Sequence, residues 1–164
     1  MRLDKEKLKN IDKLPADVRR ELALLMNKHD QKTKESKIRS DFLTFVKHVW
    51  PDFIEGKHHK EIADKFNKLA EGKIKRLIIN MPPRHTKSEF GSYLLPAWMV
   101  GKNPKLKIIQ STNTTELSVR FGRKAKALID SPEYQEVFKT RLKEDSQAAG
   151  KWETAQGGEY YAAG

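Results

Sequence analysis

The sequence predicts an α/β fold in which helices flank a parallel sheet, with a helical extension before it. Two short apolar runs, residues 77–79 and 106–110, each fit a buried strand, and the segment between them fits a helix. A second amphipathic segment, residues 115–129, follows the second run. Strand, helix, strand and helix in this order favour a right-handed βαβ unit.

The composition restricts the classes of protein to which the chain can belong. Its 164 residues suit one domain, and since only 37% are apolar, the core must come from amphipathic faces. The net charge of +11 favours an anionic partner such as a nucleotide or nucleic acid, although a solvated lysine-rich surface would explain it equally well. The absence of cysteine excludes disulfides and thiolate sites. With no long apolar run, we expect a soluble intracellular protein with no membrane partner.

Residues 1–36 are predicted to form a helical N-terminal extension that ends in a linker. Three apolar residues recur at helical spacing behind Pro15, namely Val18, Leu22 and Leu25. Proline suits the first turn of a helix, and the polar stretch 28–37 favours a linker. The α/β domain is therefore expected to span residues 37–164.

Two more helices are expected before the first strand. The first carries the apolar stripe Ile38, Phe42, Phe45, Val46 and Val49. Pro51 should stop this helix, because proline lacks an N–H and restricts the residue before it. The second is expected over residues 58–71, followed by Gly72 in the left-handed conformation that often ends a helix.

The remaining elements follow the first strand. A helix is expected from about Lys87, with Pro96 as its kink or end. Thr114 or Thr115 can cap the helix over residues 115–129. Residues 151–163 fit a hairpin that turns at its Gly-Gly pair, Gly157 and Gly158.

Residues 81–88 occupy the place of a phosphate-binding loop, between a predicted strand and a predicted helix. They read Met-Pro-Pro-Arg-His-Thr-Lys-Ser. Compared with the pattern G-x-x-x-x-G-K-[ST], Met81 and Thr86 replace the two glycines. Because a β-branched residue rarely adopts a positive φ, we expect a negative φ at Thr86.

This loop offers the groups that a triphosphate and Mg²⁺ require. The backbone N–H groups of residues 84–88, at the start of a helix, would cradle the phosphates. Lys87 would reach the β and γ phosphates, and the Ser88 hydroxyl would ligate Mg²⁺. Arg84 would stabilise the charge that develops in phosphoryl transfer, unless it forms a surface ion pair.

We therefore predict an ATP site with Arg84 and Lys87 as catalytic residues and Ser88 as the metal ligand. The predicted nucleotide-binding residues of the loop are Arg84, His85, Thr86, Lys87, Ser88 and Glu89. His85 is expected to pack or cap locally and has no catalytic role.

At these residues the sequence resembles the large terminase subunit of tailed bacteriophages, in the group whose loop has proline-proline-arginine-histidine before the lysine. The resemblance covers roughly residues 42–164. Its pieces, in order, are Gly56-Lys57-His58-His59, Leu77 to Glu89, Pro96-Ala97-Trp98, Gln110 to Arg123, Ser131-Pro132-Glu133-Tyr134, and Trp152 with Gly157-Gly158. Several matches in the same order are more specific than one loop.

The resemblance implies a P-loop ATPase motor for viral genome packaging, which with a nuclease domain drives double-stranded DNA into a procapsid in the host cytoplasm. It implies the portal protein, the small terminase subunit and other copies of the chain in a ring as partners. His59 lies where related ATPases place an adenine-contacting residue; a histidine that faces its neighbours is the alternative. The family's acidic Walker B strand and nuclease carboxylates have no counterpart in residues 1–164, which implies an incomplete ATPase domain, weak nucleotide binding and little turnover.

Two other functions agree with the same residues. A different P-loop enzyme, helicase-like or a kinase, would share the loop but not the flanking matches. A non-enzymatic basic module would bind nucleic acid through lysines, with Lys87 and Ser88 together by coincidence.

Overall fold

The computed structural model describes residues 14–145 and 148–164, and the chain divides between Ser36 and Lys37 into two compact units. The described part of the first unit contains most of helix α2 (Ala16–Ser40), which confirms the predicted leading helix. The prediction of a linker at residues 28–37 is wrong, because α2 continues through them. Lysine, glutamine and glutamate are good helix formers, so polarity alone does not end a helix.

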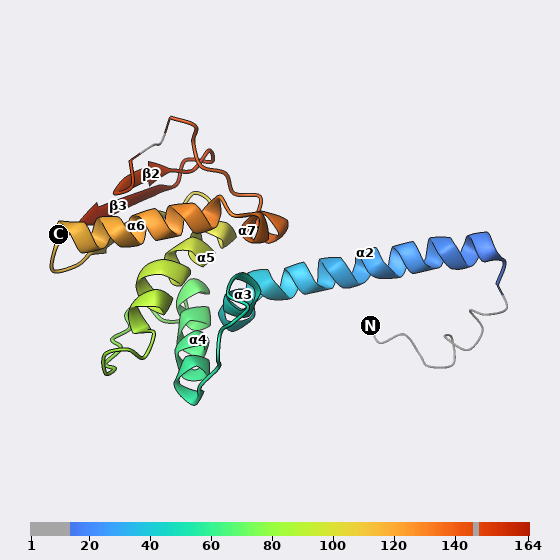
Figure 1. Cartoon of the computed structure of the whole chain (residues 1–164), viewed down its shortest axis with the longest axis horizontal. Helices are drawn as coiled ribbons and strands as arrows, with labels where there is room; N and C mark the ends of the chain where they lie inside the picture. The colour runs from blue at the N-terminus through green and yellow to red at the C-terminus, as the bar shows by residue number, and fades with distance from the viewer. Residues whose placement is uncertain (1–13, 146–147) are drawn as a thin grey trace. The chain divides into compact units, whose positions relative to one another are not determined.

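The second unit begins in the last turn of α2 and contains the α/β arrangement (Figure 1). Its elements in order are α3 (Phe42–Val49), α4 (Lys57–Ala70), η2 (Glu89–Leu94), α5 (Leu95–Lys102), β1 (Lys107–Ser111), α6 (Thr115–Ile129), α7 (Pro132–Val137), β2 (Lys151–Glu153) and β3 (Glu159–Ala163). The predictions for α4, β1, α6 and the final hairpin are confirmed. Gly72 and Gly157 have the positive φ values of +73° and +91° that their turns require.

α2 and α3 are separate helices, and Asp41 between them is the N-cap of α3. The apolar stripe predicted for one helix therefore belongs to two, with Ile38 in α2 and the other members in α3. Asp41 accepts a hydrogen bond from the Thr44 backbone N–H at 2.8 Å and one from the Asn67 side chain at 2.8 Å. The side-chain Oδ1 of Asn67 accepts in turn from the Phe42 backbone N–H at 2.8 Å, which ties α3 to α4.

Asp41→Ala is expected to lower the free energy of unfolding by about 1 kcal/mol, since the N-cap is lost. Partial burial raises the pKa of Asp41, but the hydrogen bonds from Thr44 and Asn67 outweigh it and lower the pKa. A carboxyl with a lowered folded pKa stabilises the fold above its unfolded pKa and loses this effect as the pH falls through the folded pKa. Urea denaturation should therefore show the difference from wild type at pH 7 and a smaller one below about pH 4. A difference of equal size at both pH values, or the same loss in the exposed control Asp52→Ala, would contradict this assignment.

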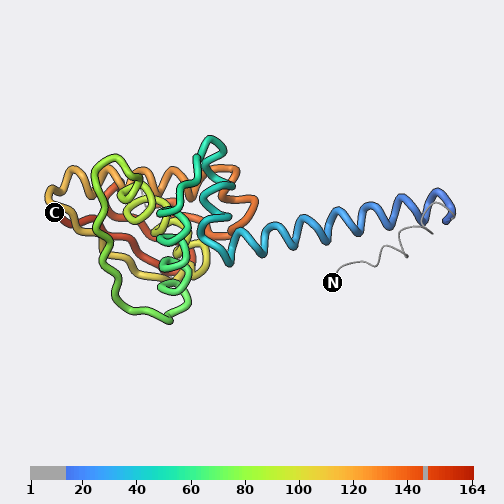
Figure 2. Tube along the Cα trace, turned by 90° about the horizontal axis from the view of Figure 1, so that it is seen from below, coloured from blue at the N-terminus to red at the C-terminus, as the bar shows by residue number. Residues whose placement is uncertain are grey.

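The predicted strand at residues 77–79 is not formed. Residues 76–82 have no regular secondary structure, and Ile78 is 86% exposed. Figure 2 shows this part of the chain as a long extended path before the helix that follows the loop. Leu77 and Ile79 on either side are half-buried, so the backbone is extended with alternating burial but has no neighbouring strand among the described residues. A strand needs a partner for its backbone groups, and local hydrophobicity does not supply one.

The helix after the loop begins at Lys87, as predicted, and continues to Lys102. Pro96 does not end it. The six residues of η2 instead adopt a π-helix, in which the Leu95 N–H bonds to the Phe90 carbonyl five residues earlier. Proline removes one intrahelical donor, and the wider π turn accommodates the shift in register.

The sheet is small and mixed, in the order β1-β3-β2. β3 pairs in parallel with β1, with Ile109 opposite Tyr161, and antiparallel with β2. α6 packs along β1 and β3 (Figure 1). Tyr160 and Ala162 are buried, whereas Ile109 and Tyr161 are 78% and 52% exposed, so the described residues cover one face of the sheet. The α/β class is confirmed, but the parallel neighbour of β1 is β3 and not residues 77–79.

The core lies between α6 and the preceding helices. Phe42 is fully buried, with its ring centroid 5.1 Å from that of Phe66, 5.4 Å from that of Phe90 and 5.4 Å from that of Trp98. This cluster joins α3, α4, η2 and α5. No helix in the part of the chain that the structure describes is long and apolar enough to cross a bilayer.

Candidate functional site

The loop before Lys87 forms a tight turn that leads directly into a helix. Lys87 and Ser88 are its first helical residues, as the sequence predicts. Arg84 and Thr86 both have left-handed backbones, with φ values of 63° and 59°. The prediction of a negative φ at Thr86 is therefore wrong. A strained backbone of this kind costs about 1–3 kcal/mol, so neighbouring contacts must hold it.

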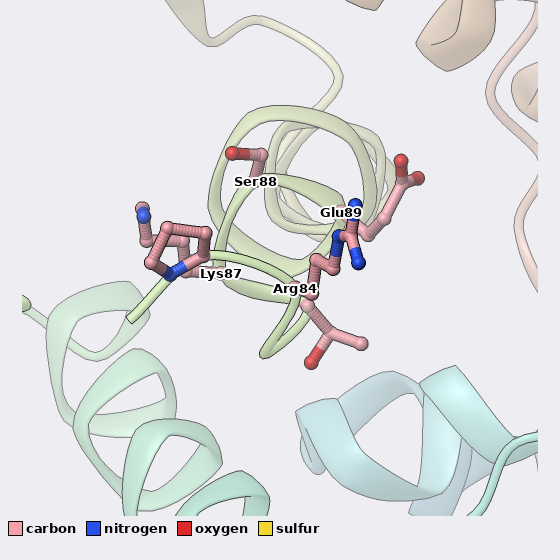
Figure 3. A pocket seen from close by; sticks show the side chains of 6 residues that line it. Arg84, Lys87, Ser88 and Glu89 are labelled. Atoms are coloured by element: carbon pink, nitrogen blue, oxygen red, sulfur yellow. The ribbon is translucent and has the colours of Figure 1, made fainter. Parts of the chain in front are cut away.

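A hollow of about 440 Å³ lies beside this turn. It is lined by Pro83, Arg84, Thr86, Lys87, Ser88 and Glu89. Figure 3 shows the Ser88 side chain at the start of the helix, with Lys87 on one side of the loop and Arg84 and Glu89 on the other. Most of the residues predicted to bind the nucleotide thus meet at one surface hollow. A positive φ at Thr86 without such a hollow would have argued against a phosphate site.

Lys87 folds back over the loop. Its Nζ donates to the Met81 carbonyl oxygen at 3.2 Å, and its side chain is exposed. Neither Lys87 nor Arg84 has an ion-pair partner within the described residues. One weak hydrogen bond to a neutral carbonyl is readily exchanged for a charge-assisted bond to a phosphate.

His59 lies behind the loop and contacts it. It is buried, with 5% of its surface exposed. Its Nδ1 accepts from the Gly56 backbone N–H at 2.9 Å, and its Nε2 lies 2.6 Å from the Thr86 Oγ1. Because a backbone N–H can only donate, Nδ1 is unprotonated and Nε2–H donates to Thr86. Both ring nitrogens are thereby occupied in this structure, and the adenine contact that the resemblance implies stays a prediction.

Two other histidines lie near His59. The His58 ring centroid is 3.8 Å from that of His59, and the His58 and His85 rings are 5.8 Å apart. Burial lowers the pKa of His59, and the neighbouring charges of His58 and His85 lower it further, against an opposing effect of Glu55. His59 is therefore neutral at pH 7. The His85 Nδ1 lies 2.9 Å from the Pro83 carbonyl oxygen, so His85 caps the turn locally, in agreement with the sequence prediction.

Glu89 is held by a residue that the sequence analysis did not identify. Lys124 of α6 donates to both of its carboxylate oxygens, at 2.8 and 2.9 Å. Among the described residues that line the hollow, Glu89 is the one acidic side chain. A salt bridge between residues 35 positions apart leaves no signal in a single sequence. The threonine in place of the loop glycine was a signal, because Thr86 needs a stabilising partner if the loop keeps the conformation that glycine allows.

The loop offers a side-chain oxygen suited to a metal ion, the Ser88 hydroxyl. No group of three or more His, Cys, Asp or Glu side chains suited to a metal ion occurs in the described ranges. Mg²⁺ commonly uses one or two protein oxygens together with phosphate oxygens and water, and Ser88 could supply one.

No protein-family model, curated protein sequence or solved structure matches this chain.

Proposed function

We propose that this chain is the ATP-binding part of a DNA-packaging motor of the kind found in tailed-phage terminase large subunits. One observation carries the ATP site: the left-handed turn at Arg84 and Thr86 leads straight into a helix that begins with Lys87 and Ser88, beside a hollow of about 440 Å³. Free N–H groups at the start of a helix, a lysine and a hydroxyl are the groups that bind a triphosphate with Mg²⁺.

In this proposal the loop residues have separate roles. The backbone N–H groups from Arg84 to Ser88 bind phosphate oxygens, since the two prolines before them cannot donate. Lys87 exchanges the Met81 carbonyl for the β and γ phosphates, and Ser88 contributes its hydroxyl to Mg²⁺. Arg84, exposed on the other side of the turn, neutralises charge on the γ phosphate.

The site should bind ATP but hydrolyse it slowly. Phosphoryl transfer to water requires a group that orients the attacking water. Both oxygens of Glu89 accept from Lys124, and β1 ends in Gln110 and Ser111 without an acidic residue. We therefore propose that residues 1–164 bind ATP with little turnover.

The packaging role rests on the resemblance and on the net charge of +11. Double-stranded DNA is the proposed polymer substrate. The portal protein, the small terminase subunit and further copies of the chain in a ring are the proposed partners, in the cytoplasm of an infected cell.

The deciding experiment measures MgATP binding to residues 1–164 by calorimetry, with and without long duplex DNA. A motor couples its two ligands, so DNA should change the ATP affinity by about fivefold or more, and ATP should change the DNA affinity by the same factor. A kinase would bind ATP with no effect of DNA. A basic nucleic-acid-binding module would bind DNA with a steep salt dependence and would not respond to ATP. Either outcome would contradict the packaging proposal.

A further inference from the structure

Thr86 occupies a backbone conformation that its side chain disfavours. Its φ of 59° lies in the left-handed region, where glycine meets no steric penalty and a β-branched residue does. A loop of this shape built with threonine needs an interaction that a glycine loop does not. The structure contains such an interaction, and it comes from outside the loop.

The Thr86 hydroxyl is held from both sides. It accepts from His59 Nε2–H at 2.6 Å and donates to the His85 carbonyl oxygen at 2.6 Å. His59 is fixed in turn by the Gly56 N–H on its Nδ1. The four groups therefore form one directed chain of hydrogen bonds, from the start of α4 to the phosphate loop.

The His59 ring has little freedom to turn away from Thr86. Its centroid lies 4.8 Å from that of Phe53 and 5.0 Å from that of Phe90, and Phe90 belongs to the helix that the loop begins. Only the neutral ring with its proton on Nε2 can both accept from Gly56 and donate to Thr86. A buried histidine with a single role in packing would not need this one tautomer.

We propose that His59 is a positioning residue, which keeps Thr86 left-handed and so holds residues 84–88 in the open shape that receives phosphates. It acts through Thr86 and does not itself need to touch the nucleotide. The consequence for ATP rests on the proposed function, whereas the hydrogen-bonded chain itself does not.

The proposal predicts that glycine at position 86 makes His59 dispensable for ligand binding. His59→Phe keeps an aromatic ring between Phe53 and Phe90 but removes both nitrogens. In the wild-type loop it should weaken MgATP binding about 10-fold, and in a Thr86→Gly loop by less than about twofold. An equal loss in both loops would show that His59 acts independently of Thr86 and would overturn the proposal.

A second measurement tests the chain of hydrogen bonds without nucleotide. In nitrogen NMR of the ligand-free protein, His59 should be the Nε2–H tautomer, with a slowly exchanging ring proton. Thr86→Val removes the hydroxyl from an exposed loop and should make that proton exchange at least about 10-fold faster, whereas Thr86→Ser should retain its protection. Thr33→Val on α2, which removes an exposed hydroxyl bonded to the His29 carbonyl, serves as the matched control.

The two measurements separate failure of this proposal from failure of the proposed function. If wild-type protein binds no ATP but Thr86→Val still speeds the exchange of the His59 ring proton, the proposed ATP site is wrong and the positioning role stands. If Thr86→Val leaves the tautomer and the exchange rate unchanged, His59 does not hold Thr86, whatever the ATP affinity is. Should His59→Phe fail to fold, Thr86→Val decides the question alone.

Discussion

Lys87→Ala is expected to weaken MgATP binding about 100-fold while leaving the fold intact. The Lys87 amine is exposed and makes one weak hydrogen bond to the Met81 carbonyl, so the folded state loses little when it is removed. The proposed nucleotide complex would lose charge-assisted hydrogen bonds from Lys87 to two phosphates, and bonds of this kind are stronger than those between neutral groups. Titration of a fluorescent ATP analogue against the variant measures the loss, and circular dichroism and urea denaturation check the fold.

A matched control is available in Lys105→Ala. Lys105 is exposed and lies outside the loop, and its replacement by alanine changes the net charge by the same amount as Lys87→Ala. It should bind the nucleotide as the wild type does. Equal loss in both variants would mean that general positive charge attracts the nucleotide, as in the basic-module alternative, and that loss would then diminish with added salt.

The elements that the sequence predicted well are those whose signals are local. α6 begins at Thr115 behind Thr114, whose side chain accepts from the Leu117 N–H, and an apolar stripe defines its buried face. The β2–β3 hairpin follows from its Gly-Gly pair, because Gly157 needs a positive φ and a side chain at Gly158 would meet the Pro104 carbonyl. In each case the signal that predicted the element lies in a few adjacent residues, although the contact that excludes a side chain at Gly158 comes from the distant Pro104.

The elements that were predicted wrongly depend on distant partners. Residues 77–79 have the hydrophobicity of a strand, but no neighbouring strand pairs with them in the described part of the chain. The φ of Thr86 could not be predicted from residue 86 alone, because His59, 27 positions earlier, bonds to its hydroxyl. Local rules excluded a positive φ at Thr86 because it is costly for a β-branched residue, and they do not include the hydrogen bond from His59.

The candidate site shows the same division. The loop residues that line the hollow were predicted from their order along the chain, since Arg84, Lys87 and Ser88 are close in sequence. Lys124 was not, because α6 brings it to Glu89 only after the helices have packed. Lys124 neutralises the charge of Glu89 and fixes the direction of its carboxylate, so whether this pair persists in the proposed nucleotide complex bears on how well Glu89 could act as a base.

Phe42→Ala is expected to lower the free energy of unfolding by about 3–5 kcal/mol, the largest stability effect of any change proposed for this chain. The ring is fully buried and meets Phe66, Phe90 and Trp98 edge-on, at interplanar angles of 85°, 78° and 71°. Its removal leaves a cavity where α3, α4, η2 and α5 meet, and rigid aromatic neighbours collapse poorly into such a space. Urea denaturation measures the loss.

The loss of the Phe42 ring should also affect the loop at residues 84–88. Phe90 contacts both Phe42 and His59, and it lies three residues after Lys87, so freedom gained by its ring loosens the helix start and the His59–Thr86 bond together. Phe42→Ala protein that remains folded should therefore bind MgATP several-fold more weakly than wild type, with faster exchange of the His59 ring proton. Ile54→Ala, at a side chain that is 87% exposed, should change neither property, and its stability should stay within about 0.5 kcal/mol of wild type. A Phe42→Ala variant that loses stability but keeps wild-type affinity and exchange would show that the loop is held independently of the core beneath it.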